Sequence, residues 1–340
     1  MSKKEIALCA VSVLFAVMLL EVGTRLLMPK KQPAIPREVG RFDAQLGWAL
    51  RPLSHATSTR TGYEINYKIN SKGLRDDEAN YNKPQNLYRI VLVGDSRTFG
   101  LGVPIEKHFS TLLEGYFQNV EVINMGVGGF GVDQELLYLR SEGFRYEPDL
   151  VMAYVAHYAD HRHMHSERFG KSKPYFQLVD GNLVLNSSTV KEKTTNRWSD
   201  SSRVYEILLA AVDRFQKSRS PSAARKRTDK RNSRNPQFED EVNRLGEAIV
   251  FQMKAEALKH GAEFVLVTNI HRLHAAAVEK GVLSINVAEA LDNTLFDLPD
   301  KLKHINESGN GVLAWEIARF LRENRIIPVD HQFSATRAAD

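Results

Sequence analysis

The 340-residue sequence is poor in cysteine: Cys9 is the only one, so no disulfide can form within the chain. It also lacks an internal repeat and a general excess of charge, since the formal net charge is +5. Eight basic residues, against Asp229 alone, fall between residues 217 and 235, which leaves the remainder slightly acidic. A nucleic-acid-binding function is not favoured, because such proteins carry their basic residues on the folded domain.

Apolar residues are plentiful enough for a substantial core. They make up 43% of the chain, the proportion of a folded protein rather than a disordered one. The length allows one large α/β domain with additions, or two small domains.

The one long apolar run lies at the N-terminus, over residues 6–20, after Lys3 and Lys4. With part of segment 21–28 it reaches the roughly 20 residues that cross a bilayer. A signal peptide is the alternative, but no small-residue cleavage site follows at a suitable distance. We expect an uncleaved, single-pass membrane anchor with the main domain extracytoplasmic, which means periplasmic in a Gram-negative cell.

Composition divides the rest of the chain into segments. Residues 217–236 are polar and basic, which predicts a flexible insertion, with contact to anionic lipid as the alternative. Residues 63–69 alternate apolar and polar side chains, as a half-buried strand does. The predicted organisation is an anchor at 1–28, a linker at 29–40, a small β extension at 41–86, a main domain at 87–328 that contains the insertion, and a tail at 329–340.

Strand and helix patterns alternate through the main domain. Apolar runs predict strands at 89–93, 120–124, 150–155 and 264–268. Helical periodicity falls at 109–117, 133–142, 204–215, 239–259 and 311–325, and Asp180-Gly181 predicts a hairpin over 175–185. This alternation predicts an α/β fold, a three-layer sandwich with a central parallel sheet.

Chemically capable residues follow several of these strands. Ser96 follows the first strand, a glycine cluster at 126–131 the second, and a histidine-rich loop at 157–165 the third. A loop near the C-terminus holds Asp297, Asp300 and His304. The loops at one edge of a parallel sheet converge, and Ser, His and Asp together can carry out acyl transfer.

These motifs resemble the SGNH/GDSL hydrolase family. Gly94-Asp95-Ser96 matches its first block, residues 124–129 match the second, and His304 matches the last. The resemblance implies an SGNH-hydrolase (flavodoxin-like) fold with Ser96 as nucleophile and oxyanion donor, Gly129 as second oxyanion donor and His304 as catalytic histidine.

The order of the segments resembles a membrane-anchored subgroup of that family. After the apolar anchor come a Gly-Trp…Pro element, here Gly47, Trp48 and Pro52, and an Asn-Ser-x-Gly-Leu-Arg element at 70–75. The resemblance extends from the anchor to about Leu321 and leaves out the basic insertion.

Two positions depart from the family pattern. The third block should hold an asparagine, the third oxyanion donor, before an aspartate; Asp160 fits the aspartate, but no asparagine is present. Loss of one such donor costs about 10²–10³ in rate, unless Tyr158, His157, His161 or Asp160 substitutes for it. The acid expected three residues before His304 is replaced by Lys301, so Asp300 is the predicted triad acid and Asp297 the alternative.

Two features of the sequence could indicate a cofactor. His161, His163 and His165 alternate beside Asp160, but no second cluster with zinc spacing appears, so no metal is expected. The glycine cluster resembles a dinucleotide motif only loosely and lacks a ribose-binding acid. We therefore predict no cofactor.

The resulting expectation is a serine esterase or O-acyltransferase that acts through an acyl-serine, on an O-acylated extracytoplasmic glycan or polysaccharide. The carbohydrate part rests on the family resemblance. The alternatives are a catalytically impaired glycan-binding or assembly protein and a lipid esterase at the membrane surface. The sequence leaves open the choice between hydrolase and transferase, the substrate and the oligomeric state.

Overall fold

The computed structural model describes residues 2–28, 35–59, 62, 64–156, 161–186, 190–192, 202–219, 235–299, 304–328 and 331. The chain divides into two compact units. One comprises Met1–Gln32 and Lys193–Glu239, and the other Pro33–Glu192 and Asp240–Asp340.

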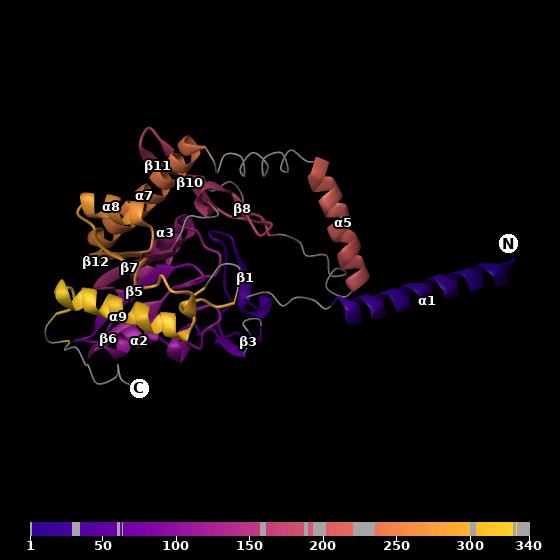
Figure 1. Cartoon of the computed structure of the whole chain (residues 1–340), viewed down its shortest axis with the longest axis horizontal. Helices are drawn as coiled ribbons and strands as arrows, with labels where there is room; N and C mark the ends of the chain where they lie inside the picture. Colours follow the sequence, from indigo (N-terminus) through magenta and orange to yellow (C-terminus); the bar gives the residue numbers. More distant parts are fainter. Residues whose placement is uncertain are drawn as a thin grey trace. The chain divides into compact units, whose positions relative to one another are not determined.

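The larger unit is built on a five-stranded sheet with the order β13-β12-β7-β5-β6 (Figure 1). Every neighbouring pair is parallel. The strands are β5 (Tyr88–Gly94), β6 (Val120–Asn124), β7 (Leu150–Val155), β12 (Glu263–Thr268) and β13 (Leu283–Asn286). Strands β5 and β7 are buried along their whole length, which explains why their sequences are continuous apolar runs.

Helices cover both faces of this sheet. Val91 and Val93 of β5 pack in one core with α3 (Val132–Ser141), α7 (Pro236–Lys259) and α8 (His271–Glu279). Ile90 and Leu92, which point the other way, pack with α2 (Phe109–Gly115) and α9 (Glu307–Glu323). The two helix groups lie on opposite sides of the sheet in Figure 1. The predicted three-layer α/β fold is confirmed.

Helix α8 and strand β13 add an αβ step that was not predicted from the sequence. Only Leu273 and Ala277 of α8 are buried, so its apolar periodicity is weak. Strand β13 has four residues at the edge of the sheet, too few for a clear strand pattern.

Among its described residues, this unit also contains four antiparallel hairpins. Their strands are β1 (Gly40–Asp43) with β2 (Gly47–Leu50), β3 (His55–Ser58) with β4 (Ile65–Lys68), β8 (Glu167–Arg168) with β9 (Lys171–Ser172), and β10 (Tyr175–Val179) with β11 (Asn182–Asn186). Strand β4 lies in the predicted alternating segment, and β10–β11 is the predicted hairpin. Short 3-10 helices occur at Arg37–Val39, Ile105–Lys107, Gly143–Tyr146, Arg162–Met164 and Thr294–Phe296.

The smaller unit contains α1 (Lys3–Leu27) and α5 (Arg203–Arg219). Helix α1 is long and apolar enough to cross a membrane, a property that an N-terminal signal sequence shares. Helix α5 continues through residues 217–219, so the start of the predicted flexible insertion is helical; residues 220–234 lie outside the described residues. The Glu21 carboxylate accepts hydrogen bonds from the Arg203 and Val204 amides and so caps α5.

Candidate active site

Ser96 lies in a tight turn that begins where β5 ends. The Phe99 amide donates to the Asp95 carbonyl at 2.8 Å, and the Leu101 amide donates to the Ser96 carbonyl at 3.0 Å. A side chain at Gly94 would approach Thr98 Oγ1 to 2.0 Å, so only glycine fits at the strand end. The turn holds the serine at the carboxyl edge of the sheet, where α/β folds place their sites.

The closest partner of this serine comes from 208 residues further along the chain. Ser96 Oγ and His304 Nε2 are 2.8 Å apart, within hydrogen-bond distance, and both residues are buried. His304 precedes α9, and its carbonyl accepts a hydrogen bond from the Leu298 amide at 2.6 Å. A histidine in this position can take the hydroxyl proton as the serine attacks.

The glycine cluster after β6 packs directly on the serine turn. A Cβ at Gly126 would lie 2.2 Å from the Phe99 nitrogen, and the Val127 amide donates to the Gly94 carbonyl at 3.1 Å. Gly129 has φ +85, a left-handed conformation that favours glycine. Close approach of backbone to backbone thus explains why glycine is needed here.

The structure describes one of the two predicted triad acids, Asp297. Asp297 pairs through its backbone with Ile305, the residue after His304, so this aspartate belongs to the histidine loop. Asp300 lies outside the described residues, as do His157, Tyr158 and Asp160, three of the four predicted substitute donors; the fourth, His161, is described and has a left-handed backbone with φ +46.

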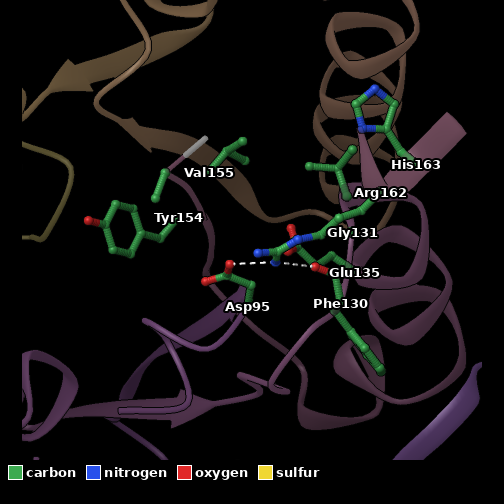
Figure 2. A pocket seen from close by; sticks show the side chains of 10 residues that line it. Asp95, Phe130, Gly131, Glu135, Tyr154, Val155, Arg162 and His163 are labelled. Carbon is green, nitrogen blue, oxygen red and sulfur yellow. Dashed lines mark hydrogen bonds and ion pairs between the residues drawn. The ribbon is translucent and has the colours of Figure 1, made fainter. Parts of the chain in front are cut away.

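Arg162 is a site residue that the sequence analysis missed. Its Nη1 donates to Asp95 Oδ2 at 2.7 Å and to the Phe130 carbonyl at 2.9 Å (Figure 2). Asp95 precedes Ser96 and Phe130 follows Gly129, so one buried guanidinium connects the serine turn with the glycine loop. One feature of the sequence could have indicated this role: Arg162 is the single Arg or Lys in the segment 157–165, where the family pattern has an asparagine and this chain has none.

A polar cavity of about 20 Å³, room for one water molecule, adjoins this guanidinium. Glu135 lines it, and its Oε2 has no hydrogen-bond partner among the described residues (Figure 2). Burial, with the nearby charge of Asp95, raises the pKa of Glu135 well above its usual range. Asp133, two residues before Glu135, forms a fully buried ion pair with Lys173.

His163, which the sequence offered as a possible metal ligand, is buried in the core. Its Nε2 lies 2.9 Å from the Val242 carbonyl of α7, and burial lowers its pKa to about 4. In the part of the chain that the structure describes, no three metal-ligating side chains form a cluster.

A second Ser–His pair lies at the start of α2. His108 Nδ1 is 2.7 Å from Ser110 Oγ, and His108 Nε2 is 3.0 Å from the Arg97 carbonyl. The carbonyl requires a proton on Nε2, so Nδ1 is assigned as the acceptor. Burial lowers the pKa of His108 to about 3, which keeps the ring neutral.

Arg75, the last residue of the 70–75 element, supports the same turn. Its guanidinium donates to the carbonyls of Phe99, Gly100 and Val103 and lies 4.5 Å from the centre of the Tyr67 ring. Burial lowers its pKa to about 10. The element therefore holds the backbone that follows Ser96.

Comparisons with known proteins concern the fold. No family model matches the chain, and no curated protein matches it. Similar solved structures include a putative lipolytic protein of the G-D-S-L family from Desulfitobacterium hafniense (13% identity, 68% of this chain and 99% of that chain, TM-score 0.35) and TesA (12%, 70% and 99%, 0.38). Another is an acetylxylan esterase from Geobacillus stearothermophilus (12%, 71% and 96%, 0.38). At such identities, the chemistry has to be inferred from this chain's own residues.

Proposed function

We propose that this chain is an SGNH-type serine esterase or O-acyltransferase that forms an acyl-enzyme at Ser96. The observation that carries the proposal is the 2.8 Å contact between Ser96 Oγ and His304 Nε2. It joins a sharp strand-end turn to a loop before the last helix, as a nucleophile and its general base require.

The proposed reaction has two steps. Ser96 Oγ attacks the ester carbonyl while His304 takes the hydroxyl proton, and the Ser96 and Gly129 amides stabilise the oxyanion. Collapse breaks the ester bond, and the alcohol leaves with the proton from His304. Water or a sugar hydroxyl then attacks the acyl-serine and gives its proton to His304. His304 passes this proton to Ser96 Oγ as the acyl–serine bond breaks, which releases a free acid or a new ester.

Asp300 is the proposed orienting acid for the His304 ring, and Asp297 remains the alternative. The backbone pairing of Asp297 with Ile305 places Asp297 in the same loop as His304 and supports it as the alternative. Orientation of the imidazole by a carboxylate stabilises the imidazolium that forms during attack.

The proposed substrate is an O-acylated glycan outside the cytoplasm, reached by a domain that α1 anchors to the membrane. The length and composition of α1 support the anchor. The glycan rests on the family resemblance alone. The Ser96–His304 contact argues against a fold that has lost its catalytic pair.

Trapping the acyl-enzyme tests this proposal. Incubation of the full-length protein with 4-nitrophenyl acetate, followed by acid quench and peptide mass spectrometry, should find an acetyl group on Ser96. Loss of the adduct in His304→Ala would support the general base. An acetyl group on other residues only would contradict the mechanism.

A further inference from the structure

The β8–β9 hairpin packs beside the candidate oxyanion loop. A Cβ at Gly47 would lie 2.6 Å from the Ser172 carbonyl oxygen, so the hairpin approaches the Gly-Trp element closely. Trp48 Nε1 donates to the Gly128 carbonyl at 3.1 Å. The Gly-Trp element therefore contacts both the hairpin and the glycine loop.

Phe169, at the tip of this hairpin, has an unusual conformation. Its φ is +53, a left-handed value that is rare for a bulky side chain. The residue is 72% exposed, yet its ring edge lies 2.6 Å from the position that a Gly129 Cβ would take. Neither burial nor backbone preference explains an aromatic ring here, and strained residues cluster at ligand-binding sites.

Two cations lie near the Phe169 and Trp48 rings, whose centres are 6.4 Å apart. The Arg168 guanidinium lies 4.4 Å from the centre of the Phe169 ring, and Lys171 Nζ lies 5.7 Å from the centre of the Trp48 ring. Burial and the nearby charge of Arg37 lower the pKa of Lys171. The exposed Glu38 and Glu167 adjoin these residues in sequence.

We propose that Phe169 and Lys171 form a subsite for a saccharide unit that carries a carboxylate or phosphate. The Phe169 ring would pack on the apolar face of the sugar, and the Lys171 ammonium would pair with its anionic group. Because Phe169 touches Gly129, a unit bound here lies next to the ester carbonyl. This subsite rests on the proposed function for its role and adds the charge class of the substrate.

The form of the surface favours a saccharide over a lipid. In the described hairpin, Phe169 is the one large apolar side chain that is strongly exposed. A single ring among charged neighbours suits a polar ligand that stacks and pairs, whereas membrane insertion uses a broader apolar face.

Binding to the full-length Ser96→Ala protein in zwitterionic detergent tests the subsite without requiring turnover. Calorimetric titration would compare an oligogalacturonate with a neutral xylo-oligosaccharide. We expect the charged ligand to bind at least 10-fold more tightly. Phe169→Asn, which tolerates the left-handed backbone, should weaken it about 10-fold, as should Lys171→Gln. Lys280→Gln, at an exposed position, is the matched control.

Equal affinity for both ligands, or unchanged binding in both hairpin variants, would overturn the subsite. So would binding of phosphatidylglycerol vesicles that depends on Phe169 when neither oligosaccharide binds. If Ser96→Ala binds the charged ligand as expected while the wild-type chain never forms an acyl-serine, the subsite stands and the proposed function fails.

Discussion

The described part of the chain holds two buried Ser–His pairs at almost the same distance. Ser96 and His304 are 2.8 Å apart and Ser110 and His108 are 2.7 Å apart. The first pair joins loops 208 residues apart at the sheet edge, whereas the second spans two residues at a helix start. A short contact therefore does not identify a catalytic pair.

The surroundings separate the two pairs. His108 has both ring nitrogens engaged, with Nε2 on the Arg97 carbonyl, and it caps α2 by accepting from the Ser110 amide. The turn that holds Ser96 instead packs on the glycine loop, which contains Gly129, the proposed second oxyanion donor. The first pair is suited to chemistry and the second to stability.

The largest expected effect separates the two histidines. His304→Ala should lower the rate of 4-nitrophenyl acetate hydrolysis by about 10²–10⁴, the contribution of a general base. His108→Asn, which can still cap the helix, should change this rate less than threefold. Initial rates of the folded variants measure the difference, and comparable losses in the two would remove the distinction.

A pair of left-handed glycines tests the oxyanion loop. Gly129→Ala should reduce hydrolysis about 10²-fold, the cost of one displaced oxyanion donor, because a Cβ there collides with Phe169. Gly181 has a similar φ of +79, but the space around it is open. Gly181→Ala should therefore keep its activity and lose only about 1 kcal/mol of stability. Full activity in Gly129→Ala would exclude Gly129 from the oxyanion site.

Arg162 and Arg75, two of the buried arginines, should fail in different ways. Arg162→Lys keeps a charge but cannot bridge Asp95 and Phe130 with the same geometry, so we expect about 10-fold slower acylation. Arg75→Lys leaves buried carbonyls unsatisfied and should cost about 3 kcal/mol of stability, with a smaller effect on rate. Acylation kinetics and thermal unfolding of each variant would show the two patterns, and identical patterns would contradict them.

The last expected effect is on the pH dependence of stability, and it leaves the catalytic rate aside. Burial lowers the pKa of His108 from the usual 6.5 to about 3 in the folded chain. The His108 ring therefore binds a proton more tightly in the unfolded chain than in the folded one. The stability it contributes is complete above pH 6.5 and is lost as the pH falls toward 3. The Tm of the wild type should therefore fall more between pH 6.5 and 4 than that of His108→Asn; parallel curves would contradict this.

Long, strongly patterned elements were predictable from the sequence. Strands β6 and β7 have the predicted bounds because they are buried apolar runs between turns. Helix α8 and strand β13 were missed because two buried residues and a four-residue edge strand leave little periodicity.

Sequence motifs predicted the catalytic candidates, but they did not predict the residues that hold these candidates in place. Ser96 and Gly129 follow the ends of predicted strands, and His304 precedes the last predicted helix. Arg162 acts through contacts to Asp95 and to a backbone carbonyl of Phe130, and no local pattern predicts contacts across 32 and 67 positions.

Labelling with a fluorophosphonate probe tests the central claim most directly, since the probe requires only an activated serine. The full-length wild type, Ser96→Ala and Ser110→Ala would be compared in detergent after thermal unfolding confirms that each is folded. We predict labelling of the wild type and of Ser110→Ala, and none of Ser96→Ala. Labelling that persists in Ser96→Ala, or a folded wild type that takes up no probe, would contradict an activated serine at position 96.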